Sequence, residues 1–263
     1  MLSKNAIKSA LIDGKEVFGL VNSVPLPLMI EMIAYANYDF VILDMEHLLR
    51  DPTELEHAIR AAECSNITAF VRVPVDSPHL IKHALDAGAD GIVLPQVSSK
   101  TQVQVAADAC FYPPKGTRGI TGGKNTGFGH ISIADYVKQA NEEVMLTVMI
   151  ESQQGLDNLD EILSVSDVDM VLEGALDLAV SLGHGHNTQH VDVQSAINSI
   201  ADGCHKHQRT FCAIPRANGQ IDKWRSQGIT AFVAGQDRGI LFKALQKNLS
   251  QFKQNTLQTK ESI

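Results

Sequence analysis

Acidic side chains directly follow two neighbouring apolar runs of this sequence. Glu151 comes straight after Met149-Ile150, and Asp177 follows the next run by a few residues. Two carboxylates on adjacent strand ends suit a hard divalent cation, because Mg²⁺ takes one or two carboxylates and keeps water or substrate oxygens as its other ligands. From the residues alone the alternative is equally open, namely that each carboxylate caps a helix or forms an ion pair.

A cationic group and a titratable ring follow two other apolar runs. Arg72 lies in Val71-Arg72-Val73-Pro74, where a guanidinium would point into a barrel mouth and match the oxygens of a 2-oxo acid. His47 follows Asp44 by three positions, so we expect Asp44 to set the imidazole tautomer and leave the other nitrogen available as a base. The alternatives are a structural ion pair for Arg72 and a loop histidine without a role.

Two other polar segments are weaker candidates. His184-Gly185-His186, with His190 four residues on, has a spacing that zinc accepts, but no strand or turn fixes its geometry, so we interpret it as an ordinary loop. The glycine-rich segment from Tyr112 to Gly129 lacks the Gly-Lys-Ser/Thr ending of a phosphate loop, and we interpret it as a flexible, lid-like loop.

Short β-rich runs that alternate with helical stretches would position these side chains. The expected strands are Val17–Val21, Phe40–Leu43, Ala69–Val73, Gly91–Leu94, Leu146–Ile150, Asp169–Leu172, Phe211–Ile214 and Ala231–Val233. Nearly continuous apolar strands alternating with helices indicate a parallel sheet covered on both faces. Eight such units in about 250 residues favour a closed (β/α)₈ TIM barrel over an open sheet. In that α/β fold the loops after the strands carry the chemistry, so the candidate residues would share one rim.

The expected helices include Pro52–Cys64 and Pro78–Ala87, which begin at proline as many helices do. We expect residues 1–263 to form a single barrel domain. Its last helix would begin near Gly239, and the polar residues 250–263 would follow as a tail or as an arm on a neighbouring subunit.

The bulk composition excludes several classes of partner. The 263 residues are 44% hydrophobic and carry a formal net charge of −8. Without a basic stripe, nucleic acid and anionic membranes are poor partners. The four cysteines form no Cys-x-x-Cys pair, and no run resembles a signal peptide or a membrane span. We therefore expect a cytoplasmic protein with reduced cysteines.

The same strand ends carry a resemblance to a known family. The chain resembles the HpcH/HpaI aldolase/citrate lyase family, the class II 2-oxo acid aldolases of the pyruvate/phosphoenolpyruvate barrel superfamily. The resemblance extends from about Leu11 to Leu249. Its local signatures are Phe40-Val41-Ile42-Leu43-Asp44-Met45-Glu46-His47, Val71-Arg72-Val73-Pro74, Tyr112-Pro113-Pro114-Lys115-Gly116-Thr117-Arg118-Gly119, Ile150-Glu151 and Gly174-Ala175-Leu176-Asp177-Leu178.

The resemblance implies roles for individual residues. Glu151 and Asp177 match the metal-binding pair of the family, with Mg²⁺ or Mn²⁺ as the ion. Arg72 matches the arginine that contacts the oxo group and stabilises the enolate. His47, oriented by Asp44, matches the acid–base histidine that acts through water. Backbone amides would hold the carboxylate of a 2-oxo acid substrate, and they belong to Gly174, Ala175 and Leu176. A homo-oligomer, hexamer or dimer, with a swapped last helix is also implied.

Several positions depart from the family pattern. Met149 replaces a glutamine, Met45 a glycine and Ala179 a serine, and Ala175-Leu176 stands where Pro-Ala is usual. Polar groups are lost while the metal pair is kept, which suggests the same enolate chemistry with a different partner.

The favoured function is therefore that of the branch resembling siderophore-biosynthesis citrate synthases of the staphyloferrin B type, which join oxaloacetate to acetyl-CoA. One alternative is a class II aldolase that cleaves 4-hydroxy-2-oxo acids to pyruvate and an aldehyde. The other is a non-catalytic protein that binds 2-oxo acids.

Overall fold

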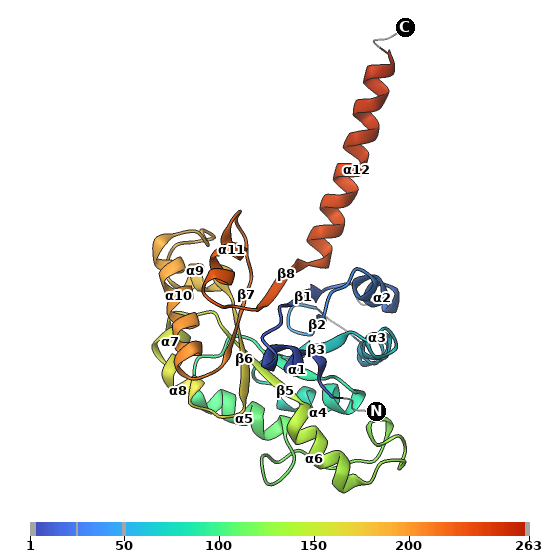
Figure 1. Ribbon diagram of the computed structural model, residues 1–263, viewed down its shortest axis with the longest axis vertical. Helices are drawn as coiled ribbons and strands as arrows, with labels where there is room; N and C mark the ends of the chain where they lie inside the picture. Colours follow the sequence, from blue (N-terminus) through green and yellow to red (C-terminus); the bar gives the residue numbers. More distant parts are fainter. Residues whose placement is uncertain (1–3, 25, 49–50, 261–263) are drawn as a thin grey trace.

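Eight parallel strands close into a barrel in sequence order, which confirms the expected (β/α)₈ fold (Figure 1). The computed structural model describes residues 4–24, 26–48 and 51–260, with side chains described as far as Lys253. The strands are β1 (Val17–Asn22), β2 (Phe40–Asp44), β3 (Thr68–Arg72), β4 (Gly91–Leu94), β5 (Met145–Ile150), β6 (Val168–Glu173), β7 (Thr210–Ala213) and β8 (Ala231–Gln236).

Helices surround the barrel, and those predicted at Pro52–Cys64 and Pro78–Ala87 have those bounds. The helices are α1 (Ala6–Ile12), α2 (Pro27–Tyr35), α3 (Pro52–Cys64), α4 (Pro78–Ala87), α5 (Lys100–Cys110), the 3₁₀ helix η1 (Lys124–Thr126), α6 (Ile133–Glu143), α7 (Gln153–Asp157), α8 (Leu159–Leu163), α9 (Ala175–Ser181), α10 (Val191–Lys206), α11 (Gln220–Ser226) and α12 (Asp237–Lys260). The short helices α1, α9 and α11 were not expected, because their few residues give too little periodicity to recognise.

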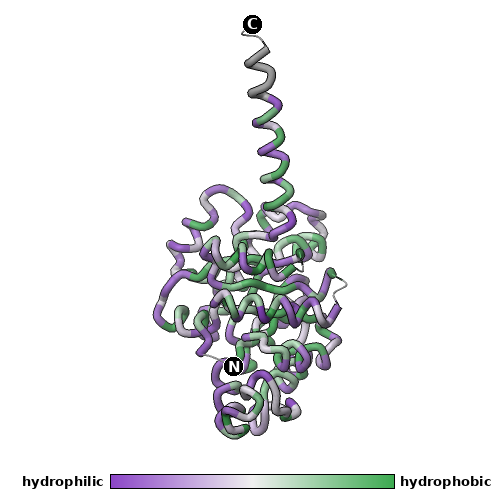
Figure 2. The backbone as a smooth tube through the Cα atoms, turned by 90° about the vertical axis from the view of Figure 1, so that its right-hand side faces the viewer, coloured by the Kyte–Doolittle hydropathy of each residue, from purple (hydrophilic) through white to green (hydrophobic). Residues whose placement is uncertain are grey.

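Two apolar layers hold the barrel together, because successive side chains of a strand point to opposite faces. One set fills the barrel interior and includes Phe40, Phe70 and Met170, joined by Ile7 from α1. The other set packs against the surrounding helices. Gly19 makes room for the ring of Phe40, since a Cβ there would lie 2.0 Å from it. Figure 2 shows the resulting apolar centre and its more polar surroundings.

Aspartates tie three pairs of neighbouring strands together at the end of the barrel where the strands begin. Each accepts a hydrogen bond from the backbone N–H of the second residue of the preceding strand. The pairs are Phe18 with Asp39 (2.7 Å), Ala69 with Asp90 (2.9 Å) and Leu146 with Asp169 (2.9 Å). Strand starts expose amides that a closed barrel must satisfy, so these carboxylates stabilise the end opposite the candidate site.

The glycine-rich segment lies at this same end, and its interpretation as a lid was wrong. Lys124 Nζ donates to the carbonyl of Ala87 at 3.2 Å, and Asn125 Nδ2 donates to that of Leu85 at 2.8 Å. Both carbonyls belong to the last turn of α4, just before β4 begins. The segment is therefore fastened to the barrel far from the carboxyl ends of the strands.

The last helix projects away from the barrel (Figures 1 and 2). It begins at Asp237, two residues before the expected Gly239, and continues without a break beyond Ser250 as far as Lys260. The predicted polar tail is thus helical through Lys260, and residues 261–263 lie outside the described part. Among the described residues, no helix combines the length and the apolar character that a membrane span requires.

Candidate active site

Arg72 at the end of β3 and Asp44 at the end of β2 form an ion pair with two hydrogen bonds. Arg72 Nε donates to Asp44 Oδ1 at 2.9 Å and Nη2 to Oδ2 at 2.8 Å. The two residues face each other in the strand register. Burial would raise the pKa of Asp44, but the hydrogen bonds and charge of Arg72 outweigh it and the pKa is lowered. The guanidinium is therefore fixed in place by a carboxylate that is ionised at neutral pH.

Asp44 does not contact the ring of His47, which corrects one expectation. Its Oδ1 instead accepts the backbone N–H groups of Glu46 at 3.0 Å and of His47 at 3.4 Å. The His47 ring lies beside Glu46, with 3.5 Å between Nε2 and Oε2, and about half of its side chain is exposed. Asp44 thus shapes the turn that carries His47, and it is the carboxylate of Glu46 that faces the imidazole.

Gln96 connects two carboxylates from different strands. Its backbone N–H donates to Glu151 Oε2 at 2.8 Å, and its side-chain amide donates to Glu46 Oε1 at 2.8 Å. Gln96 follows β4 in a left-handed conformation with φ of 53°. Such a backbone is uncommon for a residue with a side chain and persists where its surroundings impose it.

Glu151 is a buried carboxylate in a crowded acidic environment. Burial is the largest cause that raises its pKa to about 7, and the negative charges of Glu46 and Asp177 add to it. Gly174 allows this placement, because a Cβ at that position would lie 2.3 Å from Glu151 Cγ and Oε1. Position 174 therefore requires glycine, because the side chain of Glu151 occupies the space that a Cβ would need.

Asp177 lies in the first turn of α9 and is exposed. The structure brings it together with Glu151 and Arg72 in one cavity of about 290 Å³, as the sequence predicted. Of the three backbone amides expected to hold a substrate carboxylate, two already donate to groups within the protein. The amide of Gly174 donates to the carbonyl of Ile150 at 3.3 Å, and that of Ala175 to Glu173 at 2.8 Å. Within the described residues, the amide of Leu176 is the one of the three without an acceptor in the protein.

A second ion pair, between Arg216 and the buried Glu173, also lines this cavity. Arg216 Nη1 pairs with Glu173 Oε1, whose carboxylate also accepts the amides of Ile214 at 3.1 Å and Ala175 at 2.8 Å. Burial raises the pKa of Glu173, although the charge of Arg216 opposes that shift. Arg216 remains partly exposed toward the cavity, with 27% of its side chain accessible.

Four of the residues that form these contacts were assigned no role from the sequence. The residues concerned are Glu46, Gln96, Glu173 and Arg216. The available signal was their place directly after an apolar run, which they share with Glu151. What was missing was the pairing across strands, because nothing in the order of residues tells which rim side chains face each other.

Comparisons with known proteins identify the family of this chain. Residues 20–244 match the family model of HpcH/HpaI aldolase/citrate lyase. A 5-keto-4-deoxy-D-glucarate aldolase of Escherichia coli (strain K12) is 33% identical over 250 residues, which cover 95% of this chain and 97% of the relative.

Two solved structures are similar over nearly the whole chain. Citrate synthase SbnG shares 37% identity with a TM-score of 0.88, covering 95% of this chain and 98% of the other. An HpcH/HpaI aldolase from Desulfitobacterium hafniense DCB-2 shares 26% identity with a TM-score of 0.89, covering 95% and 97%. This chain is therefore an enzyme that belongs to the HpcH/HpaI aldolase/citrate lyase family.

Proposed function

We propose that this enzyme joins oxaloacetate to acetyl-CoA and releases citrate for siderophore biosynthesis. The observation that carries the proposal is the pair of guanidinium groups, Arg72 and Arg216, that line one cavity. A guanidinium matches the planar oxygens of a carboxylate or oxo acid. Oxaloacetate has a carboxylate at each end, whereas pyruvate has only one. A cavity with two separate arginines suits the dicarboxylic acid better.

A divalent cation fits the carboxylates of this cavity. Glu46 Oε2 is buried and accepts no hydrogen bond within the described chain, although Arg72 Nη1 lies 3.2 Å away. Crowded carboxylates with an unsatisfied oxygen are an environment that a hard cation stabilises. We propose that Glu151 and Asp177 hold Mg²⁺ or Mn²⁺, with Glu46 close by. When bound, the ion would withdraw charge from the oxygens of the 2-oxo acid.

Arg72 and His47 have complementary tasks in the proposed reaction. The ion pair with Asp44 uses Nε and Nη2 of Arg72 and holds the guanidinium in place, so its remaining donors would stabilise the developing negative charge without having to reorganise. His47, about half exposed beside Glu46, would remove a proton from the methyl group of the thioester. The resulting carbanion attacks the oxaloacetate carbonyl, and the alkoxide that forms takes up a proton. Water then hydrolyses the thioester and releases coenzyme A and citrate.

The walls of the cavity favour this reaction over cleavage of a sugar acid. Met149, Leu176 and Ile214 present apolar side chains to the cavity. The hydroxyl groups of a polyhydroxy aldehyde need polar partners, since an unpaired buried hydroxyl is costly. The free amide of Leu176 remains as the backbone donor for a substrate carboxylate.

The second candidate is the class II aldolase reaction on 4-hydroxy-2-oxo acids. The 33% identity with the 5-keto-4-deoxy-D-glucarate aldolase of E. coli favours it. In that reaction the same Arg72 would stabilise the enolate of pyruvate, and Arg216 would contact a carboxylate of the aldehyde fragment.

A direct assay separates the two candidates. Purified enzyme is incubated with oxaloacetate and acetyl-CoA, with added Mg²⁺ or Mn²⁺ or with chelator, and coenzyme A release and citrate are measured. Citrate formation in the metal-containing samples is expected. Arg216→Lys should raise KM for oxaloacetate about tenfold and leave inhibition by pyruvate unchanged, because only the dicarboxylic acid reaches it. Absence of citrate, with rapid pyruvate formation from 4-hydroxy-2-oxo acids, would put the aldolase first.

A further inference from the structure

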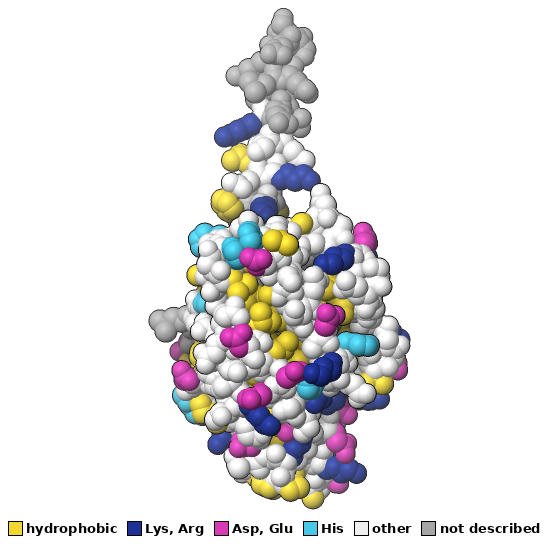
Figure 3. Space-filling model, turned by 90° about the vertical axis from the view of Figure 1, so that its left-hand side faces the viewer, with side chains coloured by type: hydrophobic (Ala, Val, Ile, Leu, Met, Phe, Trp, Pro, Cys, Tyr) yellow, Lys and Arg dark blue, Asp and Glu magenta, His cyan; other side chains and the backbone are white. Residues whose placement is uncertain are grey.

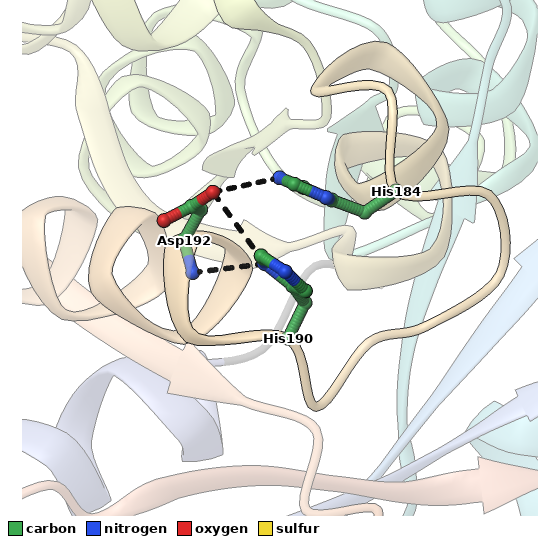
Figure 4. Close-up of side chains that lie close together, drawn as sticks. All are labelled: His184, His190 and Asp192. Carbon is green, nitrogen blue, oxygen red and sulfur yellow. Dashed lines mark hydrogen bonds and ion pairs between the residues drawn. The ribbon is translucent and has the colours of Figure 1, made fainter.

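Two histidines and an aspartate converge outside the candidate active site, in the connection between α9 and α10 (Figure 4). His184 Nε2 lies 2.9 Å from Asp192 Oδ2, and His190 Nδ1 lies 3.5 Å from the same oxygen. One ligand atom from each residue can be chosen so that all three lie within 4.8 Å of one another. Figure 3 shows histidine side chains gathered beside a carboxylate near the end of the molecule from which α12 projects.

The start of α10 supplies the rigidity that sequence analysis could not find in this loop. His190 is the N-cap of α10, and its Nδ1 accepts the backbone N–H of Asp192 at 3.3 Å. Asp192 lies in the first turn of the same helix. The rings of His184 and His190 stack, with 3.6 Å between their centroids and 17° between their planes. Two of the three side chains are therefore fixed by a helix end, and the third is held against them.

We infer that His184, His190 and Asp192 form a binding site for a divalent transition-metal ion such as Zn²⁺. Ligand atoms of a tetrahedral zinc site lie about 3.3 Å apart, given Zn–N and Zn–O bonds of about 2.0–2.1 Å. The separations of 2.9 and 3.5 Å lie on either side of that value. Two imidazoles and one carboxylate leave further positions open for water, as in other sites with three protein ligands.

The charges of the cluster also suit a cation. Nδ1 of His190 accepts the backbone N–H of Asp192 at 3.3 Å, so this nitrogen carries no proton, and a metal ion bound through it would replace that long hydrogen bond. The stacked rings share a single carboxylate, and two protonated imidazoles at 3.6 Å would repel each other. A bound metal ion takes the place of the proton between His184 and Asp192 and is coordinated by the neutral form of both rings. A surface ion pair alone would not require the second imidazole.

This site shares no residue with the cavity that holds Glu151 and Asp177, so the inference does not depend on the proposed function. The test is a calorimetric titration of the full-length chain with Zn²⁺. It is done in an Asp177→Asn background, which removes a ligand of the proposed active-site ion. One Zn²⁺ per chain is the expected stoichiometry.

Two ligand variants and one control decide the outcome. His184→Ala and His190→Ser should each weaken Zn²⁺ binding at least about tenfold. The serine keeps an oxygen acceptor for the helix N-cap, so α10 should still begin at the same place. His79→Ala is the control, because His79 is an exposed histidine that also lies next to another histidine, His83. Its affinity for Zn²⁺ should equal that of the background protein.

A second readout checks that nitrogen ligands are involved. Co²⁺ bound in place of Zn²⁺ should give visible absorption bands that disappear in the double variant His184→Ala/His190→Ser. The inference is overturned if the background protein binds no Zn²⁺, or if the double variant binds it as tightly as the His79→Ala control.

Discussion

The forked pair between Arg72 and Asp44 shows how individual residues prepare the site before a substrate binds. Asp44 is completely buried, and it meets the guanidinium with two hydrogen bonds of 2.9 and 2.8 Å. This geometry requires the planar fork of arginine, which lysine cannot reproduce. Donors held in advance contribute most where charge develops during the reaction, because they do not reorganise at that moment.

Arg72→Lys should therefore lower kcat by about 10²–10³ and change KM much less, since the lost contact strengthens in the transition state. Steady-state kinetics with oxaloacetate and acetyl-CoA provide the measurement. Arg60→Lys is the matched control, because Arg60 forms an exposed pair with Glu56 on α3. A large rise in KM with unchanged kcat would show that Arg72 contributes only to substrate binding.

Gly174 has an equally specific task beside the proposed metal ligand. Gly174→Ala would place a methyl group 2.3 Å from Glu151, so either the carboxylate or the start of α9 must move. We expect a loss of about 1–3 kcal/mol in the free energy of unfolding, together with loss of the thermal stabilisation that added Mg²⁺ or Mn²⁺ gives the wild type. Gly119→Ala is the control, since nothing lies within 4 Å of a Cβ there. Equal metal stabilisation in both variants would contradict the assignment of Glu151.

At the scale of the elements, the barrel separates stability from chemistry between its two ends. The aspartates Asp39, Asp90 and Asp169 satisfy strand amides at one end, whereas Glu46, Glu151 and Glu173 line the other. As in other barrels of this kind, residues at the carboxyl ends of the strands can therefore change the reaction, while residues at the strand starts maintain the fold.

The raised pKa of Asp90 makes the cost of burying this carboxylate testable. Burial raises it from 3.8 to about 6, so the folded protein holds the proton more tightly than the unfolded chain does. Protonation therefore favours folding, and the stability of the wild type is partly lost as pH rises through about 6. Asp90→Asn keeps an oxygen for the amide of Ala69 and carries no charge. Its free energy of unfolding, relative to wild type, should rise by about 1–2 kcal/mol between pH 5 and pH 8. Both proteins are measured by urea denaturation. A difference in free energy of unfolding that is the same at both pH values would contradict this.

At the scale of the whole molecule, α12 is a helix whose apolar side chains stay uncovered within the described chain. It projects from the barrel and exposes a series of large apolar side chains (Figures 1 and 3). They are Ile240, Leu241, Phe242, Leu245, Leu249 and Phe252. Exposed apolar stripes of this kind are typical of protein interfaces. We propose that α12 packs on a second copy of the chain in a homo-oligomer.

Light scattering should then give a mass that is a multiple of the 28.6 kDa of one chain. The double variant Phe242→Asp/Leu245→Asp should dissociate toward the monomer, because it puts two charges on the apolar face. Ser250→Asp/Gln251→Asp adds the same charges on the side of the helix away from Phe242 and Leu245 and should leave the mass unchanged. A wild-type mass of 28.6 kDa would refute the assembly.

Much of the barrel and its candidate site could be predicted because both depend on local order. Apolar runs alternating with helices determine a (β/α)₈ barrel, and residues that directly follow strands must share one rim. The sequence therefore predicts that Arg72, Glu151 and Asp177 are neighbours at one rim, and the structure has all three in one cavity.

Only the tertiary structure decided which rim residues pair, because pairing depends on the register of strands far apart in the chain. It gave Asp44 to Arg72 instead of to the His47 ring, joined Glu46 to Glu151 through Gln96, and brought Arg216 to Glu173. The same reason explains the loop histidines. His184 and His190 have a spacing that zinc accepts, but the sequence did not show what fixes them, since Asp192 becomes their neighbour only when the first turn of α10 folds.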